Sequence, residues 1–145
     1  MRALTLIGLA LAAIPLVAGQ KITTGPPKLE VEAGAQEGPS WDPAGWLYFV
    51  GRNQVSRLNL HGGATQGKVG VFLDKVANPN TSVVDPQGRV LVCEAGGRRV
   101  TRTGKDGVTE VLADNYEGKK LNSPNDISLD SKGRIYFTEI GRAHV

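Results

Sequence analysis

Two side chains that can act as oxygen ligands occupy equivalent places in the sequence. Glu37 lies five residues before Asp42, and Asn125 lies five residues before Asp130. Each of these aspartates begins a four-residue segment that ends in Gly, the pattern of a type I turn. A carboxylate and an amide carbonyl are hard ligands suited to Ca²⁺ or Mg²⁺, and the carboxylate also suits Zn²⁺. The spacing predicts a divalent metal site if the fold brings the two positions together.

These residue types also have simpler explanations. Glu37 is compatible with a solvated loop residue. Asn122 and Asn125 flank Pro124, and asparagine next to proline is typical of turns. The spacing alone leaves both readings open.

The turns themselves repeat along the chain. They begin at Asp42, Asp85 and Asp130, and each is followed by a short apolar run. A repeat of about 40–50 residues with several short strands per unit is typical of propeller blades. Expected strands are residues 46–50, 55–60, 69–73, 81–84, 89–93, 99–102 and 108–112, with an earlier candidate at 29–32. Residues 121–139 are expected to form a β-hairpin, whose turn is Asp130-Ser131-Lys132-Gly133. The sequence therefore predicts an all-β fold, an incomplete β-propeller of about three blades.

Such a fold would position the candidate ligands. Residues that precede the first strand of a blade tend to face the central channel. Because Glu37 and Asn125 hold the same place in different blades, we expect their side chains to converge on the propeller axis.

Composition narrows the possible partners. The chain has 145 residues, a net charge of +3 and 40% apolar residues, which excludes an intrinsically disordered protein. The basic residues form no stripe, so we expect no nucleic-acid partner. The single cysteine, Cys93, permits neither an internal disulfide nor a cysteine metal site. It lies in an apolar run, which predicts inert packing.

Both ends of the chain have distinct patterns. Residues 1–19 read as a secretory signal peptide, with an uncleaved membrane anchor as the alternative. Residues 20–28 read as a linker and 29–139 as the partial propeller. After cleavage the protein would be secreted or periplasmic, with no membrane partner. Asn80-Thr81-Ser82 fits a glycosylation sequon, which matters only in a eukaryotic secretory pathway.

The last six residues are unlike the rest. Residues 140–145 read Ile-Gly-Arg-Ala-His-Val, which one reading frame of a common sequencing adapter also encodes. We expect this tail to be non-native, and Glu139 to be suspect because its codon would span the junction.

Three segments carry a family resemblance. EGPSWDPAGWLYFV, LVCEAGGRRVTR and LNSPNDISLDSKGRIYFT resemble the senescence-marker-protein, gluconolactonase and luciferin-regenerating (SGL-like) family. The resemblance runs from Glu37 to Thr138 and covers the N-terminal half of the family's domain. It implies a six-bladed propeller, and many members are divalent-metal-dependent lactone hydrolases.

The resemblance also implies roles for individual residues. Glu37 matches the family's metal-ligating glutamate, and Asn125 matches an asparagine that contacts substrate or completes the coordination. Asn122 and Asp126 belong to the same motif and are expected to bind substrate. Ca²⁺ is the expected metal, with Zn²⁺ or Mg²⁺ as alternatives. The general base is expected beyond the chain end, so the fragment alone is expected to be inactive.

The implied function is a gluconolactonase-like hydrolysis of small sugar lactones. A metal would polarise the lactone carbonyl while a carboxylate activates water. The alternative is a secreted, non-catalytic propeller that binds a protein or a carbohydrate. An Asn and an Asp at channel-facing positions of later blades would favour the hydrolase. Glu94 and Arg98 are further candidates to line a pocket, unless they form a salt bridge at a strand end.

Overall fold

The computed structural model describes residues 32–141, which form twelve strands and contain no helix that could cross a membrane. The predicted signal peptide, linker and residues 142–145 lie outside the described residues. So does most of the strand expected at 29–32. The prediction of an all-β fold is confirmed.

The strands form two complete four-stranded sheets and the beginning of a third. Blade 1 contains β1 (Glu37–Asp42), β2 (Trp46–Gly51), β3 (Gln54–Asn59) and β4 (Val69–Leu73). Blade 2 contains β5 (Pro79–Val84), β6 (Val90–Glu94), β7 (Arg99–Thr103) and β8 (Thr109–Ala113). The third unit is the hairpin of β11 (Pro124–Leu129) and β12 (Ile135–Glu139). Neighbouring strands are antiparallel and follow chain order, as expected of propeller blades.

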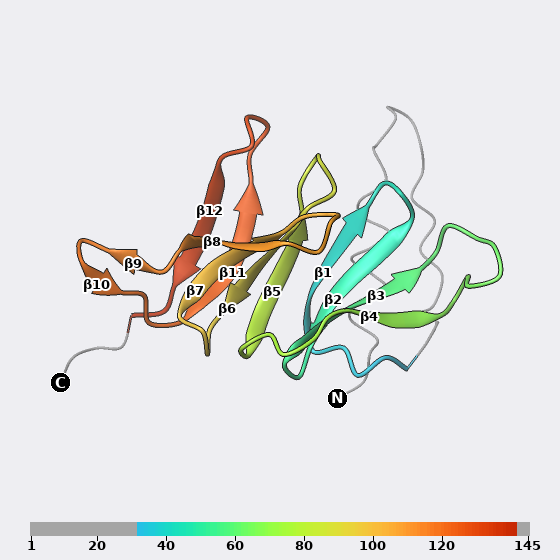
Figure 1. The fold of residues 1–145 in the computed structure, drawn as a ribbon, viewed down its shortest axis with the longest axis horizontal. Helices are drawn as coiled ribbons and strands as arrows, with labels where there is room; N and C mark the ends of the chain where they lie inside the picture. The colour runs from blue at the N-terminus through green and yellow to red at the C-terminus, as the bar shows by residue number, and fades with distance from the viewer. Residues whose placement is uncertain (1–31, 142–145) are drawn as a thin grey trace, which may run out of the picture.

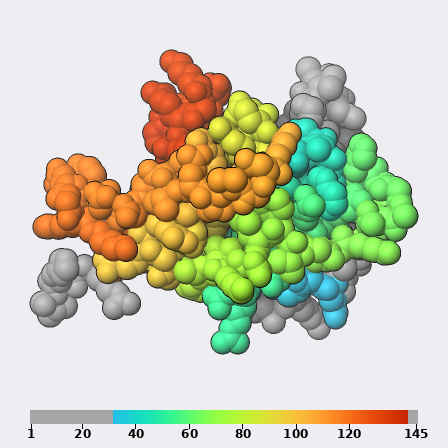
Figure 2. All heavy atoms as spheres, viewed as in Figure 1, coloured from blue at the N-terminus to red at the C-terminus, as the bar shows by residue number. Residues whose placement is uncertain are grey.

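One small hairpin lies between blade 2 and the third unit. It pairs β9 (Asn115–Tyr116) with β10 (Lys119–Lys120) through a turn in which Glu117 and Gly118 both have positive φ. It projects from the body as an orange lobe in Figure 2. Neither of its strands is among those expected from the sequence. β1, which begins five residues before the first turn aspartate, is also not among the expected strands.

The first strands of the three units lie next to one another. β5 contacts β1 on one side and β11 on the other. In Figure 1 the turns that follow β1, β5 and β11 all point to the top of the view. The opening ends of these three inner strands therefore lie together at the other end of the sheets.

Each blade buries residues on both of its faces. In β6, Val90 and Val92 pack in a cluster with Tyr48, Val50 and Val55 of blade 1. The alternate residues Leu91 and Cys93 pack in another cluster with Ile127 and Phe137 of the third unit. Because side chains alternate across a strand, one strand serves two interfaces, and all of β6 is buried.

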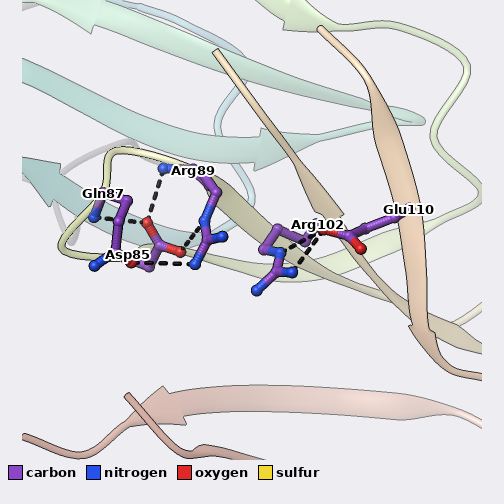
Figure 3. A network of polar contacts seen from close by, with 5 residues as sticks. All are labelled: Asp85, Gln87, Arg89, Arg102 and Glu110. Atoms are coloured by element: carbon purple, nitrogen blue, oxygen red, sulfur yellow. Dashed lines mark hydrogen bonds and ion pairs between the residues drawn. The ribbon is translucent and has the colours of Figure 1, made fainter. Parts of the chain in front are cut away.

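The predicted turns have the expected geometry, and those at Asp85 and Asp130 add an ion pair. The amide of Gly88 donates to the Asp85 carbonyl at 2.8 Å, and Gly88 has a φ of +75°. The Asp85 carboxylate accepts hydrogen bonds from the amides of Gln87 and Arg89 and from Arg89 Nε, at 2.9, 2.9 and 2.6 Å (Figure 3). Asp130 repeats this arrangement with Arg134. The turn aspartate therefore fixes both the backbone and the first side chain after the turn.

The ion pair of Asp130 with Arg134 is expected to make a pH-dependent contribution to the stability of the fold. The Arg134 side chain, followed by backbone and Tyr136 hydrogen bonds, holds the pKa of this carboxyl below its usual value. Because the folded-state pKa is depressed, the stabilisation exists above the unfolded pKa of about 3.9 and is lost as pH falls through the folded value. Asp130→Asn should therefore lower Tm at about pH 7, and the difference from wild type should shrink below about pH 4. Thermal melts followed by circular dichroism measure this, and a difference that stays constant down to about pH 2 would contradict it.

The thiol of Cys93 is expected to be unreactive. Its side chain is fully buried, and burial, aided by the charges of Asp126 and Glu139, raises the pKa of the thiol to about 12. The predicted inert packing is thus supported. We expect labelling by iodoacetamide at about pH 8 to be more than about 100-fold slower in the native protein than in denaturant, because the thiolate is the nucleophile. Equal labelling rates in the two states would show that the thiol is accessible.

Candidate functional site

The first strand of each unit opens with an irregularity in its pairing. The register of β1 against β2 shifts between Glu37 and Ser40. The same shift occurs between Pro79 and Thr81 in β5, and between Pro124 and Ile127 in β11. Such bulges interrupt the ladder and redirect side chains. Each bulge contains or borders the residue five positions before the turn aspartate, which is Glu37, Asn80 or Asn125.

Two of these residues contact each other across neighbouring inner strands. Asn80 Nδ2 on β5 donates a hydrogen bond to Asn125 Oδ1 on β11 at 2.9 Å. Both side chains are half-buried. The contact leaves an acceptor on Asn80 and the two donors of the Asn125 amide for other partners. Asn80 was not predicted as a site residue, although it precedes Asp85 by the same five residues that separate Glu37 from Asp42 and Asn125 from Asp130.

Glu37 lies on the other side of β5. Its neighbour Gly38 has a φ of +62°, and a Cβ at Gly38 would lie 2.7 Å from both Thr81 Cα and the amide nitrogen of Ser82. Only glycine therefore allows β1 to approach β5 this closely. Ser82 Oγ donates to the Gly38 carbonyl at 3.1 Å, which fixes the contact. Glu37 is exposed and lies at the same end of the sheets as Asn80, with β5 between it and Asn125.

Asn122 and Asp126 lie on the same segment as Asn125 but make other contacts. The Asn122 side chain donates to the carbonyl of Ile140, a residue of the tail expected to be non-native. Asp126 is exposed, and its carboxylate accepts the amide of Ile127 at 2.9 Å. Neither side chain has a hydrogen bond to the Asn80–Asn125 pair within the part of the chain that the structure describes.

Glu94 and Arg98, the further candidates to line a pocket, do not pair with each other, and Glu94 forms its strand-end salt bridge with Arg99 instead. Glu94 is 2% exposed and forms an ion pair with Arg99 at 2.9 Å, while its other oxygen accepts Thr101 Oγ1 at 2.9 Å. Arg99 is the residue opposite Glu94 in the β6–β7 register. Arg98 instead donates to the carbonyls of Lys120 and Leu121. Because Glu94 is buried and hydrogen-bonded, it does not line an open pocket.

The fold is also incompatible with a glycan at Asn80. Its amide nitrogen, the atom that would carry the sugar, is bonded to Asn125. The sequon residues Thr81 and Ser82 are 7% and 4% exposed in an inner strand. A glycan would displace the contact between β5 and β11.

Glu37 and Asn125 offer the types of ligand atom that a divalent metal prefers, but they are too few to complete its coordination. Glu37 and Asn125 offer a carboxylate and an amide oxygen, both suited to Ca²⁺. Ca²⁺ takes about six to eight oxygen ligands. Among residues 32–141, no group of three or more His, Cys, Asp and Glu side chains is placed to hold a metal ion. These residues by themselves do not complete a metal site.

Known proteins resemble this chain in sequence and in fold. It is 40% identical over 63 residues to a gluconolactonase of Zymomonas mobilis, a match that covers 41% of this chain and 17% of that protein. The solved structure of XC5397 from Xanthomonas campestris, a gluconolactonase, is 38% identical with a TM-score of 0.65, over 74% of this chain and 36% of that one. A virginiamycin B lyase structure from Staphylococcus aureus is 21% identical with a TM-score of 0.56, over 73% of this chain and 35% of that one. The last likeness concerns the fold alone.

These matches define the family and the extent of the likeness. The chain spans about a third of the length of the solved relatives. The family model described as the SMP-30/gluconolactonase/LRE-like region matches residues 35–145, well over half of the chain. The inner strands that carry Glu37, Asn80 and Asn125 all lie within this match. The chain therefore belongs to the SMP-30/gluconolactonase/LRE-like family.

Proposed function

We propose that this chain contributes to the active site of a hydrolase that acts on small sugar lactones. One observation carries the proposal: Asn80 and Asn125 are hydrogen-bonded at the N-terminal ends of the adjacent strands β5 and β11. Glu37 lies at the same end of β1, the third inner strand. Family membership and the gluconolactonase relatives support the lactone as substrate class.

The chemistry of the asparagines suits such a substrate. A sugar lactone carries several hydroxyl groups around a ring ester, so its recognition needs paired donors and acceptors. The half-buried Asn80–Asn125 pair offers both within one hydrogen-bonded unit. Its role in the proposal is to bind and orient the lactone ring, which lowers the entropic part of the barrier. Asn122 and Asp126 extend the same segment and are proposed to contact the outer part of the substrate. No residue between 32 and 141 is assigned as the general base.

A divalent metal forms part of the proposal, with Ca²⁺ as the first choice and Zn²⁺ or Mg²⁺ as alternatives. Glu37 and Asn125 would be two of its ligands, and other residues would have to complete the shell. A bound metal would supply Lewis-acid polarisation of the lactone carbonyl. The support is the donor chemistry of Glu37 and Asn125 and their placement at one end of the sheets.

The leader-like residues 1–19 support a further proposal, that the protein is secreted or periplasmic. N-terminal sequencing of the protein recovered from its native source would test it. A mature protein that begins near Gln20 is the expected result.

The experiment that tests the function is lactone hydrolysis by the polypeptide that the whole gene encodes. Gluconolactone hydrolysis is followed by acid release, with and without a chelator. Glu37→Gln, Asn80→Ala and Asn125→Ala should each lower kcat/KM by about tenfold or more, because each removes an interaction with metal or substrate. Gln87→Ala, at the turn end of the sheets, is the control and should be near wild type. Turnover close to wild type in both Glu37→Gln and Asn125→Ala would refute the assignment.

A further inference from the structure

A glutamate at the end of the second strand makes the same contact in two units. Glu94 and Glu139 each lie nine residues after their turn aspartate. This shared spacing favours Glu139 as a native residue, although its codon would span the expected junction with the tail. Glu94 Oε2 accepts the amide of Ala77 at 3.2 Å. Glu139 Oε1 accepts the amides of Asn122 and Ser123 at 2.9 and 2.6 Å. Ala77 and Asn122 each lie three residues before a site asparagine, so the carboxylate holds the segment that leads into the site.

The preceding blade holds the same segments from the other side. Asn53, in the β2–β3 turn, accepts the amide of Val76 on its carbonyl at 2.9 Å and the amide of Asn78 on Oδ1 at 3.3 Å. Arg98, in the β6–β7 turn, donates Nε to the Leu121 carbonyl and Nη2 to the Lys120 carbonyl. Both turn residues have a left-handed backbone, with φ of +57° and +54°. This conformation is uncommon for residues other than glycine.

Blade 1 lacks the glutamate contact. Gly51 occupies the place of Glu94 and Glu139, nine residues after Asp42. A Cβ at Gly51 would lie 3.3 Å from the Gly34 carbonyl, so the opening segment of β1 packs directly against it. The carboxylate contact thus accompanies the two strands that carry asparagine, and not the strand that carries Glu37.

We propose that these contacts form two clamps that position the asparagine pair. Arg98 and Glu139 hold residues 120–123 and set the position of Asn125. Asn53 and Glu94 hold residues 76–78 and set the position of Asn80. Between them, the clamps place Asn80 Nδ2 and Asn125 Oδ1 at hydrogen-bond distance. These four residues act by positioning the asparagine pair. Their contribution to catalysis rests on the proposed lactone hydrolysis.

Arg98 offers the cleanest test because its side chain is exposed and its removal leaves no cavity. Arg98→Met keeps an unbranched apolar stem and loses every donor, while Arg98→Lys retains one cationic donor group. Arg102→Met is the matched control: it makes the same chemical change at an arginine that pairs with Glu110 on the outer strand β8 (Figure 3).

The first measurement is hydrogen exchange by NMR on the 145-residue chain. In Arg98→Met, the amides of Leu121, Asn122 and Ser123 should exchange about tenfold faster or more, because charged hydrogen bonds to this segment are lost. The Asn80 side-chain amide signal should shift as its contact with Asn125 loosens. Arg98→Lys should restore part of both effects, and Arg102→Met should show neither.

The second measurement separates this inference from the proposed function. In the whole gene product, Arg98→Met should lower kcat/KM for gluconolactone by about tenfold, with partial recovery in Arg98→Lys. If wild type hydrolyses no lactone but the exchange results hold, the clamps stand and the proposed function fails. Unchanged exchange and an unchanged Asn80 signal in Arg98→Met would overturn the clamps, whatever the activity.

Discussion

The structure depends on the burial of both faces of each blade. β6 shows the constraint most clearly, since Val90 and Val92 pack toward blade 1 while Leu91 and Cys93 pack toward the third unit. A sheet buried in this way needs a neighbour on each side, and the neighbours place their first strands together. Asn80 and Asn125, which are 45 residues apart, therefore lie within hydrogen-bond distance. The site is a result of packing between blades and not of any single blade.

Much of the fold could be predicted because short local sequence patterns identify its repeated unit. An aspartate whose carboxylate accepts one or two backbone amides and a glycine with positive φ define each turn, and both are visible as residue types. The apolar runs after the turns give the second strands. β1 was missed because its sequence, Glu-Gly-Pro-Ser-Trp-Asp, includes Gly and Pro and shows no clear alternation of apolar and polar residues. The β9–β10 hairpin was missed because a two-residue strand is too short to have a period.

The site was less accessible to sequence reasoning. Asn80 had the same spacing as Glu37 and Asn125, but its fit to a glycosylation sequon gave it a different explanation. The structure decides between the two by the contact of Asn80 with Asn125. The partner of Glu94 depended on strand register, which places Arg99 and not Arg98 opposite it. Register is set by the length of the connecting turn, and a difference of one residue reverses the direction of a side chain.

The alternation in β6 has a consequence for how mutations combine. Val92 and Cys93 are adjacent in the chain but belong to different clusters. Substitutions at these two positions remove side-chain contacts from separate interfaces, so any energetic coupling between them must pass through the backbone of β6. Val92 and Val55, although they lie in different blades, share a cluster and should be energetically coupled. Each hydrophobic cluster therefore joins two neighbouring units, and each blade contributes one face to each of two clusters. The interfaces between blades, more than the individual blades, are expected to unfold as cooperative units.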